Sequence, residues 1–310
     1  MAVAERSSRE DAGAASREAL LEVQGLTKRY GGLAAVDDLS FRVSAGEAFG
    51  IAGPNGAGKT TLFDTITGHA RATEGHILFA GEEIQAQTSH AICQLGVART
   101  FQIPAVFPEH TVLGNIVVGA YFGRRSRTVL GTRFDEESVE RAREAARLVG
   151  LGTKLDAIAG PLPLFDKKRL MIASAVATEP RLLMLDEPVG GLNPREVDEV
   201  LELVRQVRAT GVTVVLIEHV MRALMAISDR VMVMNHGRLL FEGTPADVQR
   251  DEEVIRVYLG TATEERPGTA GADAQELDAW RASNVEDVAD VVGPASPDAS
   301  PSAEGGGRDA

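Results

Sequence analysis

The chain has 310 residues, of which 44% are hydrophobic and 25% charged, which is typical of a soluble globular protein with a substantial core. Its formal net charge of −13 comes mostly from the segment after residue 260, so the rest of the chain lacks the basic surface of a nucleic-acid-binding protein. No uncharged apolar run reaches the roughly 18 residues of a membrane-spanning helix, and the single cysteine, Cys93, excludes an internal disulfide.

Two tails are expected to flank a folded body. Residues 1–20 and 261–310 are predicted to be disordered, because the second segment in particular is rich in Ala, Gly, Pro, Asp and Glu and cannot bury enough apolar surface to offset its ordering entropy. Residues 274–292 have rough helical spacing, which leaves a docking helix as the alternative there. The folded body is then residues 21–260.

In chain order, the body alternates short β-rich apolar runs with longer segments of helical spacing. The predicted strands are 47–53, 76–81, 181–186, 212–218 and a hairpin at 230–243. The predicted helices are 59–69, 135–150, 170–179 and 195–210. This alternation predicts a parallel or mixed sheet with helices on both faces, and the absence of a convincing strand in 104–176 predicts a helical insertion.

The strongest motif follows the first predicted strand and opens the first predicted helix. It matches the P-loop pattern GxxxxGK[ST], in which glycines let the backbone wrap a phosphate and the helix N-terminus attracts negative charge. Lys59 is expected to reach the β and γ phosphates of ATP, and the Thr60 hydroxyl to ligate Mg²⁺. The predicted nucleotide-binding residues of this loop are Gly53, Pro54, Asn55, Gly56, Ala57, Gly58, Lys59, Thr60 and Thr61.

A pair of adjacent acids ends the predicted strand 181–186. Asp186 is expected to hold Mg²⁺ through water, and Glu187 to polarise the attacking water in ATP hydrolysis. An acid pair at a strand end is by itself usually a solvated loop, but the P-loop upstream favours the functional interpretation.

Three further motifs accompany these two. They are Arg99-Thr100-Phe101-Gln102, Val189-Gly190-Gly191-Leu192-Asn193-Pro194 and Leu216-Ile217-Glu218-His219. In order and spacing, residues 21–260 resemble the ATP-binding subunits of ABC transporters. The resemblance implies an α/β fold, a P-loop NTPase ABC cassette with a RecA-like α/β core, an antiparallel β-subdomain and an α-helical subdomain at about 104–176.

The same resemblance assigns roles to single residues. Gln102 is expected to sense the γ-phosphate and Mg²⁺ and to pass that state to the helical subdomain. His219 is expected to contact the γ-phosphate, and Asn193 occupies the D-loop where many relatives carry Asp. Tyr30 corresponds to the aromatic on which adenine stacks, a role that needs only a π face; a core or surface tyrosine is the alternative.

Finer features are similar to the subgroup that serves uptake of branched-chain amino acids and related amides or urea. They are the stretches ARTFQ, LNP, IEHVM, ISDRVMV, FEGTPADV and VIRVYLG. This resemblance implies ATP and Mg²⁺ as cofactors and membrane permease subunits as partners, docked on residues 103–111, with a solute-binding protein acting indirectly. It also implies peripheral attachment to the cytoplasmic face of the cell membrane and no nucleic-acid partner.

The family's signature segment, close to Leu-Ser-Gly-Gly-Gln, is altered in this chain. Its position is occupied by Leu162, Pro163, Leu164, Phe165 and Asp166. In a head-to-tail dimer this segment faces the ATP of the partner's P-loop, where proline supplies no hydroxyl and no N–H. A carboxylate of Asp166 at about 5 Å from phosphate costs roughly 3 kcal/mol at an effective dielectric near 20.

Two interpretations of this segment stay open. In the first, Asp166 faces the phosphate and weakens ATP binding at that site. In the second, Asp166 is a helix N-cap, Lys167, Lys168 and Arg169 compensate for its charge, and the altered segment still forms an active site. Because the chain's own half-site is complete, we expect a heterodimer with a second ABC ATPase rather than a homodimer. The competing function is a regulatory subunit that binds ATP and dimerises with little hydrolysis.

Overall fold

Two β-sheets form the frame of the chain in the computed structural model, which describes residues 18–123 and 134–264. The antiparallel sheet has the order β2-β1-β4-β5, with β1 (Ala19–Tyr30), β2 (Leu33–Ser44), β4 (Glu74–Phe79) and β5 (Glu82–Glu83). The second sheet has the order β10-β9-β3-β8-β7-β6 and is parallel except for β10. Its strands are β3 (Ala48–Ala52), β6 (Val97–Arg99), β7 (Leu182–Asp186), β8 (Thr213–Ile217), β9 (Arg230–Asn235) and β10 (Arg238–Gly243).

The central strands β3, β7 and β8 are buried along their whole length, as expected for parallel strands covered on both faces. Their register aligns their ends: Ile51 pairs with Ile217, and Ile217 pairs with Asp186. The loops that leave these strands therefore begin at one edge of the sheet, which is where ligands bind in open parallel sheets.

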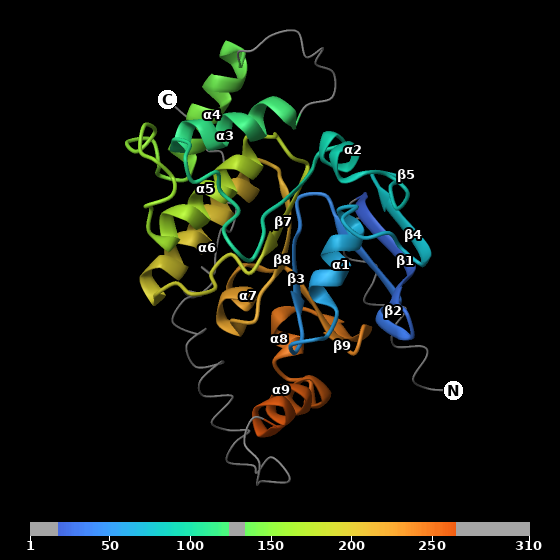
Figure 1. Ribbon diagram of the computed structural model, residues 1–310. Helices are drawn as coiled ribbons and strands as arrows, with labels where there is room; N and C mark the ends of the chain where they lie inside the picture. Colours follow the sequence, from blue (N-terminus) through green and yellow to red (C-terminus); the bar gives the residue numbers. More distant parts are fainter. Residues whose placement is uncertain (1–17, 124–133, 265–310) are drawn as a thin grey trace, which may run out of the picture.

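Helices cover the sheets in separate groups (Figure 1). Helix α1 (Lys59–Ile66) lies between the two sheets, whereas α3 (Val112–Phe122), α4 (Glu136–Leu148) and α5 (Leu164–Val176) gather at one end. The short α2 (Ser89–Gln94) precedes β6. The remaining helices are α6 (Pro194–Ala209), α7 (Met221–Ile227), α8 (Pro245–Val248) and α9 (Glu252–Glu264).

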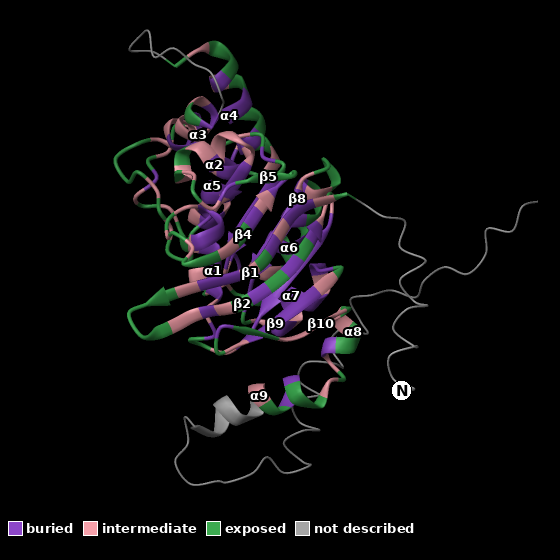
Figure 2. Ribbon diagram, turned by 90° about the vertical axis from the view of Figure 1, so that its right-hand side faces the viewer, coloured by how far each residue is buried: buried purple, intermediate pink, exposed green. Residues whose placement is uncertain are grey.

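The parallel sheet separates two hydrophobic cores. Along β7, Leu182 and Met184 join α1 and the antiparallel sheet, whereas Leu183 and Leu185 join the core that contains α3 to α7. This alternation follows from the two-residue period of a strand. The buried residues along the strands are visible in Figure 2.

The mixed sheet, all five predicted strand regions and the four predicted helices are confirmed. Residues 104–176 contribute helices and no strand of either sheet among their described residues. Both predicted tails overlap the folded body by a few residues. Strand β1 begins at Ala19 and buries Leu20, and helix α9 extends to Glu264. The rest of both predicted tails, with the stretch 274–292, lies outside the described residues.

No helix within 18–123 and 134–264 combines the length and apolar character needed to cross a membrane.

Candidate functional site: a phosphate-binding loop facing an acid pair

The loop between β3 and α1 has the backbone geometry of a phosphate cradle. Gly53, Gly56 and Gly58 all have positive φ, and a Cβ on Gly58 would lie 2.1 Å from the Ala35 carbonyl oxygen. Only glycine avoids both penalties at that position. The loop therefore stays close to the β2 backbone while its N–H groups precede the N-terminus of α1.

Lys59 closes the loop through its side chain. Its Nζ donates hydrogen bonds to the carbonyl oxygens of Gly53, at 2.6 Å, and Pro54, at 3.0 Å. Burial lowers the pKa of Lys59, and the negative charges of Glu187 and Asp186 oppose that shift. The ammonium thus lies near the acid pair, where an anionic ligand has a cation available to bind.

A cavity of about 390 Å³ joins this loop to residues distant in sequence. Gln102 and Glu187 face it from the ends of β6 and β7, and His236 reaches it from the hairpin between β9 and β10. The predicted residues Asn55 to Thr61 form one wall, and Leu33, Ala34 and Ala35 form another. His236 and the β2 residues were missed because no phosphate-binding motif includes them.

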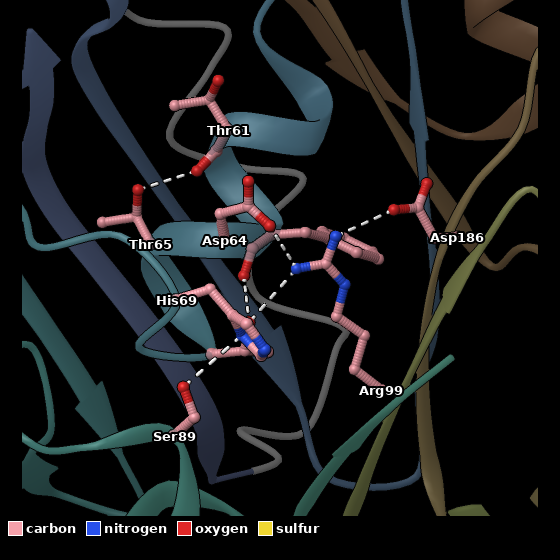
Figure 3. Close-up of polar contacts among 9 residues, drawn as sticks. Thr61, Asp64, Thr65, His69, Ser89, Arg99 and Asp186 are labelled. Atoms are coloured by element: carbon pink, nitrogen blue, oxygen red, sulfur yellow. Dashed lines mark hydrogen bonds and ion pairs between the residues drawn. The ribbon is translucent and has the colours of Figure 1, made fainter. Parts of the chain in front are cut away.

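Asp186 lies beneath the cavity rather than on its lining. It is 3% exposed, and its Oδ2 accepts a 2.9 Å hydrogen bond from Arg99. Arg99 also donates to Asp64 of α1 at 2.6 Å, so one guanidinium joins the two carboxylates (Figure 3). Burial raises the pKa of Asp186, and the bond from Arg99 acts in the opposite direction. The sequence motif contained Arg99 but gave it no role.

Glu187 is held by five groups at once. Its Oε2 accepts a hydrogen bond from Gln102 Nε2 at 2.7 Å and lies 3.5 Å from His219 Nδ1. Its N–H donates to the Ile217 carbonyl, and its own carbonyl accepts from Lys168 and from the Gly190 N–H. The three predicted catalytic residues, Gln102, Glu187 and His219, are therefore brought together.

Two predicted residues, Tyr30 and Asn193, are not part of the cavity lining. Tyr30 is 52% exposed at the end of β1, and Lys28 Nζ lies 4.6 Å from its ring centroid. Tyr30 pairs with Leu33, which lines the cavity, although the cavity lining does not include Tyr30 itself. Asn193 caps α6 in a reciprocal pair with Glu196, a role for which Asn is well suited.

The altered signature segment forms the beginning of α5. Pro163 is the N-cap residue, and its missing N–H is one that a helix start leaves without an intrahelical partner. Leu164 is exposed, and a Cβ on Gly191 would lie 3.1 Å from its Cδ2. Phe165 packs against the core of the helical group and stacks with the guanidinium of Arg169.

Asp166 turns into the protein, which corrects both earlier interpretations of this residue. It is buried in the first turn of α5 rather than at the N-cap, and its carboxylate is bonded to Lys154 at 2.5 Å and Arg169 at 3.4 Å. A carboxylate engaged by two cations beneath the surface does not project toward a facing phosphate. The predicted repulsion of roughly 3 kcal/mol was therefore wrong, because the sequence does not give the direction of a side chain within a helical turn.

The described residues contain no group of three or more His, Cys, Asp or Glu side chains that could hold a metal ion by itself.

Family models and individual relatives both match this chain to ATP-binding proteins of ABC transporters. A sequence model described as ABC transporter matches residues 36–190, and one described as branched-chain amino acid ATP-binding cassette transporter matches residues 238–264. The chain is 41% identical over 251 residues to the high-affinity branched-chain amino acid transport ATP-binding protein BraF of Pseudomonas aeruginosa, covering 78% of this chain and 98% of BraF. The corresponding protein LivG of Escherichia coli K12 is 39% identical with the same coverage.

Among solved structures, the ADP conformation of an ATP-binding cassette of an ABC transporter superposes with a TM-score of 0.72 at 30% identity, covering 78% of this chain and 99% of the other. The predicted α/β cassette fold is thus confirmed, with the P-loop, Gln102 and Glu187 lining one cavity. The chain belongs to the ABC transporter family of nucleotide-binding ATPases.

Proposed function

We propose that this chain hydrolyses ATP to energise uptake of branched-chain amino acids, or related small polar solutes, through a separate membrane permease. The cavity that joins the P-loop to Gln102 and Glu187 carries the ATPase part of the proposal. The transport part is supported by BraF and LivG, which are named as branched-chain amino acid transport ATP-binding proteins. Such a subunit would act at the cytoplasmic face of the membrane.

Each residue of the site has a chemical task in this proposal. Lys59 leaves the carbonyls of the P-loop to bind the β and γ phosphates, and the loop N–H groups bind the phosphate oxygens. Glu187 accepts a hydrogen bond from the attacking water, while His219 contacts the γ-phosphate. Tyr30, at the end of β1, offers its ring to the adenine base.

The donor set also suits Mg²⁺. Thr60, Gln102 and Asp186 offer oxygen atoms, which this ion prefers, and one carboxylate suffices because phosphates and waters complete its coordination. When bound, Mg²⁺ would neutralise charge on the transferred phosphate.

The permease is proposed to dock just beyond Gln102. Ile103 is 79% exposed and Phe107 is also exposed, which leaves apolar surface uncovered. A second cavity of about 350 Å³ lies beside them, lined by Phe101, Ala105 and Met171 among others. Exposed apolar groups bordering a hollow are typical of a protein–protein interface.

We further propose a head-to-tail heterodimer with a second ABC ATPase. The start of α5 offers no hydroxyl at Pro163 and no glycine at Leu164 or Phe165 to a facing nucleotide. In a homodimer both ATP sites would lose these contacts. In a heterodimer, Lys59 and Glu187 of this chain can work against an intact signature segment in the partner.

The test is ATPase and uptake activity of the assembled transporter with Glu187→Gln in this chain, compared with the matching change in its partner. We expect the change in this chain to abolish most of the activity and the change in the partner to have a much smaller effect. Equal losses would contradict the asymmetric arrangement. Loss of neither activity in the Glu187→Gln complex would favour the regulatory alternative, to which the relatives give no support.

A further inference from the structure

Lys168 is a buried lysine of α5 whose ammonium reaches the edge of the nucleotide site. The residue is 3% exposed, and its Nζ donates to the Glu187 carbonyl oxygen at 2.6 Å. The same nitrogen lies 3.5 Å from the Gln102 carbonyl oxygen. Both carbonyls belong to residues that face the cavity, so a helix outside the cavity lining contacts two of its segments.

A buried ammonium is costly unless hydrogen bonds and counter-charges stabilise it. Burial lowers the pKa of Lys168, and the charges of Glu218, Glu187 and Asp186 act in the opposite direction. Glu218 is itself fully buried and accepts a 2.8 Å hydrogen bond from the Val189 N–H. Lys168 is therefore one of the cations that balance these acidic groups, and an apolar side chain at this position would remove its charge and its hydrogen bonds.

The backbone of Glu187 needs such support. Its φ of 47° lies in the left-handed region, which a non-glycine residue occupies only when its surroundings hold it there. The Glu187 N–H is fixed by the Ile217 carbonyl at 2.9 Å, on strand β8. On the other side, the Glu187 carbonyl oxygen accepts hydrogen bonds from Lys168 Nζ at 2.6 Å and from the Gly190 N–H at 3.3 Å. Strand β8 and helix α5 therefore hold the backbone from which the carboxylate projects.

We propose that Lys168 is a positioning residue for Glu187. It holds the Glu187 peptide in the orientation from which the carboxylate meets the attacking water, which rests on the role given to Glu187 in the proposed function. Lys168 lies two residues after Asp166, in the helix whose start faces the partner's nucleotide in the proposed dimer.

The test measures ATP hydrolysis by the assembled transporter with Lys168→Met. We expect kcat to fall by about 10- to 100-fold and the KM for ATP to change by less than about threefold, because a misplaced base impairs the transition state more than ground-state binding. Lys168→Arg keeps a cationic donor and is expected to recover most of kcat. Lys154→Met is the control, since it removes a lysine that pairs with Asp166 at the start of α5 without touching Glu187, and should stay within about twofold of wild type.

A second comparison separates this proposal from the one on which it rests. In a Glu187→Gln background, Lys168→Met should cause no additional loss, because the lysine acts through the glutamate. Wild-type hydrolysis by Lys168→Met, with Glu187→Gln inactive, overturns the role of Lys168 alone. Wild-type hydrolysis by Glu187→Gln overturns both proposals. A loss in Lys154→Met equal to that in Lys168→Met assigns Lys168 to general support of α5 and also overturns the proposal.

Protein folding is checked by thermal unfolding and by binding of a fluorescent ATP analogue. Lys168→Gln, which is neutral but keeps a hydrogen-bond donor on a shorter side chain, is measured in parallel in case the methionine variant does not fold. We expect it also to lose kcat with little change in KM. Full activity in a folded Lys168→Gln protein contradicts the proposal.

Discussion

At the scale of single residues, Arg99 is a buried cation that pairs with two carboxylates. Its guanidinium is almost fully buried and holds Asp186 at 2.9 Å and Asp64 at 2.6 Å. Removing one partner of a buried charge pair costs about 3–5 kcal/mol, because the remaining charge keeps its desolvation penalty. We expect Arg99→Met to lower the free energy of unfolding in urea by about 3 kcal/mol or more.

Arg42→Met is the control for this prediction. Arg42 also pairs with a carboxylate, that of Glu22 at 2.6 Å, but its side chain is 70% exposed. Exposed pairs contribute at most about 1 kcal/mol, so the control should lose less than that. Similar losses in the two variants would mean that Asp186 finds solvent or another partner when Arg99 is removed.

At the scale of elements, a substitution of Asp166 at the start of α5 can distinguish a structural role of this residue from a role in nucleotide binding. Asp166 lies in the first helical turn, where a negative charge is favourable, and pairs with Lys154 and Arg169. We expect Asp166→Asn to lower the free energy of unfolding by about 1–2 kcal/mol, because it weakens a partly buried pair. ATPase activity of the assembled transporter should stay unchanged, since the carboxylate is bonded to Lys154 and Arg169 inside the protein.

A gain in ATPase activity in Asp166→Asn would contradict this geometry, because relief of charge repulsion requires the carboxylate to face the phosphate. Asp198→Asn, on the exposed side of α6, provides the control for a general effect of removing one negative charge. It should change neither stability nor activity appreciably.

The same elements explain how far the sequence could predict the structure. Strands β3, β7 and β8 were predictable because their apolar runs are uninterrupted. Strands β1 and β2 were not, because register shifts and the positive φ of Gly25 and Asp38 break the two-residue alternation. The P-loop and acid pair were found by spacing, whereas the contacts of Arg99 and Lys168 join segments that only the folded chain brings together.

At the scale of the whole molecule, the proposed ATP site draws on both sheets and on the loops after β3, β6 and β7. A ligand that binds only the folded state therefore stabilises all of these segments together. At a concentration of 100 times Kd, such a ligand raises the free energy of unfolding by about 2.7 kcal/mol. We expect this increase with Mg²⁺ and a non-hydrolysable ATP analogue, measured by urea unfolding, and a smaller one when EDTA removes the metal.

Lys59→Met should remove most of this increase, because the ammonium that leaves Gly53 and Pro54 to bind phosphate is lost. The comparison is made for each variant with and without the analogue, so that the intrinsic effect of the substitution on stability cancels. Lys154→Met, remote from the P-loop, should keep the full increase. If Lys59→Met is stabilised as much as wild type, the analogue binds elsewhere, because a site at this P-loop cannot lose its phosphate-facing cation without losing affinity.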